Sequence, residues 1–150
     1  MKISVCMASY NGAKYIKRQL QSIITQLGPY DQVVIVDDGS KDDTVQIVKS
    51  FLDPRIQLHS NSKNIGVVKT FERALHLAKG DLILLSDQDD LWYDNKIAVV
   101  MNIFLTQEVD LILHDAVIVN GSHIISNSLH ESVTSSTGLV KNIVSNTYTG

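Results

Sequence analysis

Apolar residues in the first half of the chain follow two alternating spacings. Short runs rich in Val, Ile and Leu, typical of buried strands, alternate with segments in which apolar residues recur every three or four positions. The runs cover residues 3–8, 33–36, 56–59 and 82–85. This alternation predicts an α/β fold in which helices flank a mostly parallel sheet.

Four segments have the periodicity of amphipathic helices, with apolar side chains on one face. They cover residues 16–27, 45–52, 71–78 and 97–104. Gly28 and Gly80 follow the first and third segments, and glycine commonly ends a helix at such a position. Ser40 and Asp43 precede the second segment with the spacing of a capping box, a pair of side chains that satisfies N–H groups at a helix start.

The second half of the chain carries a weaker pattern. Residues 111–119 form the longest apolar strand candidate, and the regular spacing ends after Asn120. Residues 126–150 are rich in Ser, Thr and Asn, with few apolar residues to anchor them. We therefore expect a regular core over residues 1–120, followed by residues 121–150 as the start of a region that is cut short.

Composition narrows the possible functions. The 150 residues are 44% hydrophobic, which suits one compact domain with a single core. The formal net charge is −3, and the 13 Lys and Arg residues form no basic stripe of the kind that binds nucleic acid. No apolar stretch approaches the roughly 20 residues that span a bilayer. We expect no nucleic acid partner, no transmembrane segment and a cytoplasmic location, with the inner face of the membrane left open.

The only cysteine, Cys6, lies within the first apolar run. A single cysteine cannot form an internal disulfide, so a reducing compartment is the simplest interpretation. We expect the Cys6 side chain to be buried as a small hydrophobic group.

Three polar segments follow predicted strands and carry the candidate chemistry. They are residues 8–12, 37–40 and 87–90, which read Ala-Ser-Tyr-Asn-Gly, Asp-Asp-Gly-Ser and Asp-Gln-Asp-Asp. Ligands of open α/β sheets bind outside the carboxyl ends of the strands. We therefore expect the three segments to meet at one edge of the sheet.

The acidic segment gives the strongest signal. Asp87 and Asp89, two positions apart in an extended turn, can point the same way and hold a hard divalent cation, Mg²⁺ or Mn²⁺. Such an ion completes its shell with waters and phosphate oxygens, so a sparse protein site implies a phosphate-bearing ligand. The alternative is an acidic loop that caps the following helix. An EF-hand is excluded, because its pattern would require glycine at Trp92 and glutamate at Ala98.

The other two segments are ambiguous by themselves. Asp37 and Asp38 fit a turn completed by Gly39. A carboxylate at this edge could also accept the N3 hydrogen of uracil or thymine. The residues from Tyr10 to Gly12 fit either a generic turn or a segment whose exposed backbone lines a base pocket.

Together, these segments resemble the inverting family 2 glycosyltransferases with the A-type fold. The matching motifs are residues 8–12, 36–40, 64–66 and 87–92, in that order. Four motifs in this order and spacing over residues 1–120 are more specific than any one of them. The Asp-Gln-Asp-Asp-Leu-Trp motif looks most like that of bacterial rhamnosyltransferase-type members. The resemblance implies a Rossmann-like, nucleotide-diphospho-sugar transferase fold.

The resemblance also implies roles for individual residues. The nucleotide-binding residues would be Ala8, Tyr10, Asn11, Asp38, Lys69, Asp87 and Gln88. Asp38 would contact the base, and Asp87 and Asp89 would form the metal motif with Asp89 as the direct ligand. Relatives often carry an arginine that meets the diphosphate. Here we expect Lys69 to supply that charge and Arg73 to lie on a solvated helix face beside acidic residues.

The implied reaction moves a sugar from a UDP or dTDP donor to an acceptor hydroxyl with inversion. A base takes the acceptor proton, while Mg²⁺ or Mn²⁺ stabilises charge on the departing diphosphate. The acceptor would be a saccharide or lipid-linked saccharide in bacterial surface polysaccharide synthesis. Residues 1–120 would form the nucleotide-sugar and metal-binding core, and residues 121–150 would begin the acceptor side. We expect the base beyond residue 150 and assign none among His114, Asp115, His130 and Glu131.

Other function classes stay open at this point. A non-catalytic nucleotide-sugar-binding module or an inactive homologue would show the same motifs. A sugar-phosphate nucleotidyltransferase would require a glycine-rich phosphate loop after the first strand, where this chain has only Gly12. A receiver-type signalling domain would use Asp37 and Asp38 to bind Mg²⁺, but it leaves the acidic segment after the fourth strand unexplained.

Overall fold

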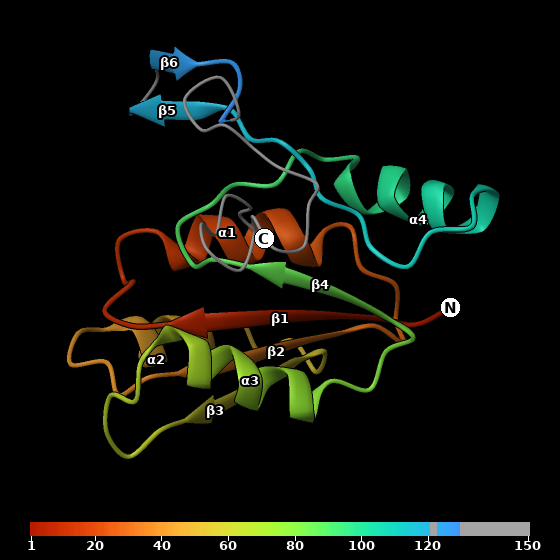
Figure 1. Ribbon diagram of the computed structural model, residues 1–150. Coiled ribbons are helices and arrows are strands. Elements are labelled where there is room, and N and C mark those ends of the chain that lie inside the picture. The colour runs from red at the N-terminus through yellow and green to blue at the C-terminus, as the bar shows by residue number, and fades with distance from the viewer. Residues whose placement is uncertain (121–122, 130–150) are drawn as a thin grey trace, which may run out of the picture. The chain divides into compact units, whose positions relative to one another are not determined.

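The computed structural model describes residues 1–120 and 123–129. The chain divides into two compact units, Met1–Gln107 and Glu108–Gly150. The first unit holds a four-stranded sheet with its helices, and the second holds a two-stranded sheet (Figure 1). Within the described ranges, no helix combines the length and the apolar character needed to cross a membrane.

All four strands of the first unit run parallel, in the order β3-β2-β1-β4 (Figure 1). The strands are β1 (Ile3–Ser9), β2 (Gln32–Asp37), β3 (Ile56–Ser60) and β4 (Leu82–Ser86). Each contains one of the four predicted apolar runs. The predicted α/β architecture with a parallel sheet is therefore confirmed.

Burial explains why the first two runs are almost continuously apolar. Side chains of a strand alternate between the two faces of a sheet, and both faces of a parallel sheet are usually covered by helices. All of β2 and nearly all of β1 are buried accordingly. β4 is an edge strand in which Leu82, Leu84 and Ser86 are buried, whereas Ile83 and Leu85 are 42% and 38% exposed.

The helices of this unit are α1 (Ile16–Ile24), α2 (Thr44–Lys49), α3 (Val67–Leu77) and α4 (Lys96–Thr106). α3 covers one face of the sheet and packs against β1 and β2, while α1 and α2 contact each other on the opposite face (Figure 1). Beneath α3, Ala74 packs with Cys6, Val34 and Val36 in a fully buried cluster. The expectation that Cys6 is a buried hydrophobic group is confirmed.

The start of α3 differs from the prediction. The helix begins at Val67, ahead of the apolar pattern over residues 71–78. Gly66 precedes it with a φ of 92°. Glycine adopts this conformation without strain, so it lets the chain turn sharply into the helix. Periodicity alone missed the first turn because Val67 and Val68 are exposed.

The predicted capping box before α2 is wrong. Asp43 is the N-cap residue and its side chain makes no capping hydrogen bond. The Ser40 hydroxyl instead donates to the Asp37 carboxylate. Asp42 takes over the capping role, since its carboxylate accepts the N–H of Thr44 at 3.0 Å.

The strand predicted over residues 111–119 is mostly wrong. The second unit contains only β5 (Ile118–Asn120) and β6 (His123–Ser126), which pair antiparallel. A strand needs a neighbour for its backbone groups, and no strand of the described part of this unit pairs with residues 111–117. Leu111 and Leu113 are 73% and 45% exposed. The Ser, Thr and Asn-rich region beyond residue 129 lies outside the described residues.

Candidate functional site

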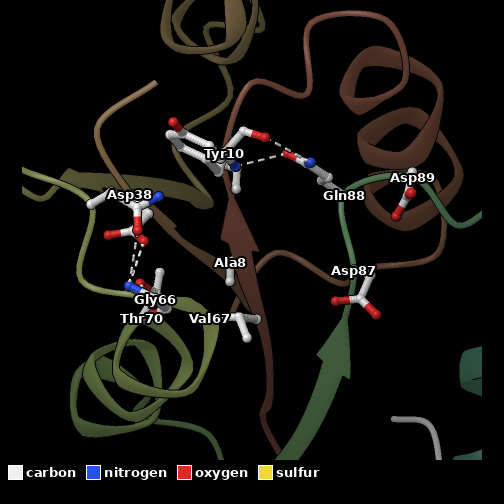
Figure 2. A pocket seen from close by; sticks show the side chains of 11 residues that line it. Ala8, Tyr10, Asp38, Gly66, Val67, Thr70, Asp87, Gln88 and Asp89 are labelled. Carbon is white, nitrogen blue, oxygen red and sulfur yellow. Dashed lines mark hydrogen bonds between the residues drawn. The ribbon is translucent and has the colours of Figure 1, made fainter. Parts of the chain in front are cut away.

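The carboxyl ends of the strands meet at one edge, as predicted. Register pairs Ser9 of β1 with Asp37 of β2, and Met7 of β1 with Ser86 of β4. The segments that follow these strands surround a cavity of about 270 Å³. Its lining residues are Ala8, Ser9, Tyr10, Asp38, Asn64, Gly66, Val67, Thr70, Asp87, Gln88 and Asp89. Figure 2 shows Asp38 on one side of the cavity, Asp87 and Asp89 on the other, and Ala8 between them.

Gln88 joins the segments that follow β1 and β4. Its amide oxygen accepts the N–H of Tyr10 at 2.9 Å, and its amide nitrogen donates to the Tyr10 carbonyl at 3.0 Å (Figure 2). A Cβ added at Gly12 would lie 2.0 Å from the Gln88 amide oxygen. A side chain at Gly12 would therefore displace the Gln88 amide, which lies directly over this glycine.

The backbone N–H groups of residues 10–13 are all engaged by side chains. Tyr10 donates to Gln88, Asn11 to the Ser40 hydroxyl, Gly12 to the Thr44 hydroxyl and Ala13 to the Asp42 carboxylate, at distances of 2.8 to 3.0 Å. A phosphate-binding loop requires free N–H groups that point at the ligand. This loop therefore cannot cradle a phosphate. It presents the ring of Tyr10, which is 45% exposed, to the cavity.

Asp37 is a turn-forming residue. Its carboxylate accepts the N–H groups of Gly39 at 3.1 Å and Ser40 at 2.9 Å, and it accepts the Ser9 hydroxyl at 3.2 Å. The side chain is 1% exposed and does not line the cavity. Asp37 is therefore a turn former rather than a carboxylate that contacts a base. A receiver-type Mg²⁺ site on this carboxylate is excluded.

Asp38 lines the cavity and also orders its wall. Its carboxylate accepts hydrogen bonds from the Asn61 amide at 2.8 Å, the Ile65 N–H at 2.9 Å and the Gly66 N–H at 2.9 Å. Burial by itself raises the pKa of Asp38, but these hydrogen bonds outweigh it and hold the pKa below its usual value. Asp38 is therefore a carboxylate at neutral pH, and it fixes the turn that leads into α3.

Asp87 and Asp89 form the acidic side of the cavity. Partial desolvation, and then the charge of Asp89, raise the pKa of Asp87 above its usual value. Within residues 1–120 and 123–129, no group of three or more Asp, Glu, His or Cys side chains could hold a metal ion. Two neighbouring carboxylates fit a Mg²⁺ or Mn²⁺ ion only when waters and a phosphate-bearing ligand complete the shell.

Two predicted nucleotide-binding residues do not line the cavity. The side-chain oxygen of Asn11 accepts the Lys41 N–H at 2.8 Å, and Asn11 adopts a φ of 48°, so it shapes the loop. Lys69 lines a separate groove on α3 together with Glu72 and Arg73. Arg73 donates to the Ser60 carbonyl at 3.1 Å and to the Asn61 side chain, rather than to acidic residues as expected.

The prediction missed the wall that α3 and the turn before it contribute to the cavity. Asn64, Gly66, Val67 and Thr70 all line it, and Thr70 is fully buried. Its hydroxyl donates to the Gly66 carbonyl at 2.8 Å, which closes the first turn of the helix. The motif at residues 64–66 was a usable signal for this wall, because a glycine before a helical segment marks a turn that brings backbone close to a ligand.

The chain matches the family model described as "Glycosyl transferase family 2" over residues 4–137. It is 28% identical over 140 residues to WfgD of Escherichia coli, a UDP-Glc:alpha-D-GlcNAc-diphosphoundecaprenol beta-1,3-glucosyltransferase, covering 93% of this chain and 55% of that protein.

Two solved structures are similar. TarS of S. aureus in complex with UDP-GlcNAc is 31% identical, with a TM-score of 0.75, 82% of this chain covered and 36% of that one. Mannosyltransferase PcManGT of Pyrobaculum calidifontis, in complex with GDP-Man and Mn²⁺, is 26% identical, with a TM-score of 0.63, 71% of this chain covered and 32% of that one.

These likenesses agree with the A-type glycosyltransferase fold expected from the four motifs. The chain spans just over half of the length of WfgD and about a third of the length of TarS and of PcManGT. The family model covers most of its residues, from the first strand to beyond the second unit's described part. The chain therefore belongs to glycosyl transferase family 2.

Proposed function

We propose that this chain is the donor-binding part of a metal-dependent glycosyltransferase that uses a UDP- or dTDP-sugar. One observation carries the proposal. Among the residues that the structure describes, the side chains lining the cavity include Asp38, Asp87 and Asp89 but no Lys or Arg. A nucleoside diphosphate is itself negatively charged, so it can enter this cavity only with a divalent cation between its phosphates and the carboxylates.

The nucleobase would lie between Tyr10 and Asp38. The exposed ring of Tyr10 offers a flat apolar surface, and Ala8 keeps the floor of the cavity open. The Asp38 carboxylate lines the cavity while it accepts hydrogen bonds from the Asn61 amide, the Ile65 N–H and the Gly66 N–H. A carboxylate at this place is suited to the N3 hydrogen of uracil or thymine, a donor that purines do not present in the same place.

The diphosphate end of the donor would lie beside Asp87 and Asp89. A bound Mg²⁺ or Mn²⁺ ion supplies positive charge against the departing diphosphate. Asp89 would be the direct ligand, and Asp87 would assist it from the end of β4. Complexes of TarS with UDP-GlcNAc and of PcManGT with GDP-Man and Mn²⁺ support a nucleotide-sugar ligand and a divalent ion in this fold.

Lys69 stays a candidate for a further contact with the diphosphate. It lies outside the cavity, but Val67 and Thr70 on either side of it in α3 line the cavity. Its flexible side chain could reach a diphosphate that extends past the rim. We expect Lys69→Ala to weaken UDP binding by no more than about threefold, because the cation supplies most of the charge. A loss above about 30-fold would instead make Lys69 a principal ligand.

The remaining parts of the reaction are proposals that rest on family membership. They are inversion at the anomeric carbon, a saccharide or lipid-linked saccharide acceptor, a place in bacterial polysaccharide synthesis and a cytoplasmic site. No base is assigned. The Asp115 carboxylate accepts the N–H groups of Ala116 at 2.8 Å and Leu129 at 2.9 Å, which gives it a structural role in the second unit.

A nucleotidyltransferase is disfavoured by the occupied N–H groups of residues 10–13. The other alternative, a donor-binding module without activity, shares the entire donor site. It differs only in the outcome of a transfer assay on the whole protein. Release of UDP that depends on an added acceptor would identify a transferase, and tight donor binding without such release would identify the module.

Calorimetric titration of the chain with UDP and dTDP, with Mn²⁺ and with a chelator, tests the donor site. We expect binding that requires Mn²⁺ and weakens at least about 10-fold in Asp89→Asn. Asp94→Asn is the matched control, because Asp94 is an exposed aspartate just beyond the loop that does not line the cavity. Equal affinity in chelator and in Mn²⁺ would contradict the metal-dependent site.

A further inference from the structure

A row of polar side chains on α1 holds the segment between β4 and α4. Gln19, Ser22 and Gln26 are three and four positions apart, so they lie along one stripe of α1 and of the turn that follows it. Each of them bonds a residue between Ser86 and Ile97. α1 therefore combines an apolar face with a polar stripe directed at the loop that carries the acidic motif.

Gln19 makes the central contacts. Its side chain is fully buried. With the amide in the orientation that satisfies both of its ends, the oxygen accepts the Ser86 hydroxyl at 2.6 Å and the Trp92 indole N–H at 3.3 Å, while the nitrogen donates to the Asp90 carbonyl. These contacts flank the acidic motif on both sides. Burial of an amide is costly unless it is hydrogen-bonded, so the loop and Gln19 hold each other in place.

Ser22 and Gln26 extend this attachment toward α4. The Trp92 N–H donates to the Ser22 hydroxyl at 3.2 Å. Gln26 donates to the Tyr93 carbonyl at 3.0 Å and accepts the Ile97 N–H at 3.1 Å. The Ile97 N–H belongs to the first turn of α4 and has no partner within its helix. Gln26 thus fixes the place where α4 begins.

The side chains of Asp87 and Asp89 are not held by hydrogen bonds of this kind within the described residues. In the described part of the chain, neither carboxylate takes part in a hydrogen bond or an ion pair. Their direction is therefore set by the backbone of the loop. That backbone is held by Gln88 on the Tyr10 side and by Gln19 on the α1 side.

We infer that Gln19 is a positioning residue for the metal-binding loop: its buried amide holds Ser86, Asp90 and Trp92 so that the Asp87 and Asp89 carboxylates face the cavity. This inference rests on the proposed function, because the metal is part of it. It adds a residue outside the cavity whose loss would weaken metal binding without removing a ligand.

The test uses the only tryptophan of the chain, Trp92, which is 5% exposed. Gln19→Met keeps the length and volume of the side chain and removes its hydrogen bonds. Gln21→Met is the matched control, an exposed position on the same helix. We expect Gln19→Met to shift the tryptophan emission to longer wavelength and to weaken Mn²⁺-dependent UDP binding about 10- to 100-fold, with Gln21→Met unchanged in both.

Ser22→Ala provides a milder variant if Gln19→Met does not fold. It removes one acceptor of the Trp92 backbone, so we expect a smaller red shift and a loss of affinity of about threefold. Tryptophan emission that is unchanged in both Gln19→Met and Ser22→Ala overturns the inference. A shifted emission also overturns it if Mn²⁺-dependent UDP binding stays as tight as in Gln21→Met.

The two proposals fail in different ways. A wild-type chain that binds UDP equally well in chelator overturns the proposed function and, with it, the metal role of Gln19. A wild-type chain with clear Mn²⁺ dependence that Gln19→Met and Ser22→Ala leave intact overturns only the role of Gln19.

Discussion

Gln88 pairs with the backbone of Tyr10 as another peptide group would, through hydrogen bonds of 2.9 and 3.0 Å to its N–H and carbonyl. The pairing joins the segments that follow β1 and β4, which carry the aromatic and acidic sides of the cavity. Gly12 lies beneath it, where a Cβ would meet the Gln88 amide unless that amide moved. The width of the cavity thus depends on a glycine that does not line it.

Gly12→Ala should displace the Gln88 amide and break both of its hydrogen bonds to Tyr10. We expect a loss of about 1–2 kcal/mol in the free energy of unfolding, since two partly exposed hydrogen bonds are lost. Urea titration of Gly12→Ala, Gln88→Ala and the double variant measures the coupling. If steric conflict with Gln88 is the cause, Gly12→Ala will cost much less in the Gln88→Ala background. Additive effects of the two substitutions would contradict this contact.

Hydrophobic spacing was enough to predict the sheet, because β1 and β2 are buried on both faces and a strand in that position is almost continuously apolar. It failed over residues 111–119, where the run is partly exposed and, within the described residues, pairs with another strand only from Ile118 onward. An apolar run becomes a strand only where another segment lies beside it to pair with, and the sequence of the run does not reveal that segment.

The meeting of the three polar segments followed from topology, since parallel strands end at one edge. Topology did not predict which N–H group each carboxylate oxygen accepts. These hydrogen bonds are what distinguish Asp37 from Asp38. Asp37 is the last residue of β2 and Asp38 follows it, yet Asp37 closes a turn while Asp38 accepts hydrogen bonds from residues 61–66. Gln19 was missed for the same reason: a polar residue within a helical pattern gives no sign of a partner 67 positions away.

Asp38→Asn should destabilise the chain in a pH-dependent manner. One Asp38 oxygen accepts the Asn61 amide and the Ile65 N–H, and the other accepts the Gly66 N–H, so the amide nitrogen of asparagine would face at least one of these donors. We expect a loss of about 2 kcal/mol or more at pH 7. The pKa of Asp38 is lowered in the folded chain. Its stabilisation is therefore complete above the unfolded value of about 3.9 and disappears as the pH falls through the folded pKa.

The difference in free energy of unfolding between wild type and Asp38→Asn should accordingly shrink below about pH 4. Urea unfolding followed by circular dichroism at pH 7 and pH 3 measures it. Asp43→Asn is the matched control, because Asp43 is exposed and makes no capping hydrogen bond. A difference as large at pH 3 as at pH 7 would show that packing, not the carboxylate charge, is responsible.

Asp87→Asn should make the metal-free chain more stable while removing metal-dependent nucleotide binding. The pKa of Asp87 is raised by partial desolvation and by Asp89, so the charged form is disfavoured in the folded state. This penalty is absent below the unfolded pKa of about 3.9, grows as the pH rises from there to the folded pKa, and is complete above it. Calorimetry in chelator at pH 7 should show a higher Tm for Asp87→Asn than for wild type, and Tm values that converge as the pH falls below about 3.9. A lower Tm at pH 7 would mean that the carboxylate has a stabilising partner.

Cys6 offers a probe of global unfolding. Its side chain is fully buried under α3 with Val34, Val36 and Ala74, and burial raises the pKa of its thiol to about 11. Only the thiolate attacks disulfide reagents, and at pH 8 both its small fraction and the absence of access prevent the reaction. The native chain should therefore react with a chromogenic disulfide far more slowly than the chain in 8 M urea, where about a quarter of thiols with a pKa near 8.5 are ionised. At intermediate urea concentrations the rate should follow the unfolded fraction measured by circular dichroism. Rapid labelling in the absence of urea would show that α3 opens away from β1 and β2 while the rest of the sheet stays folded.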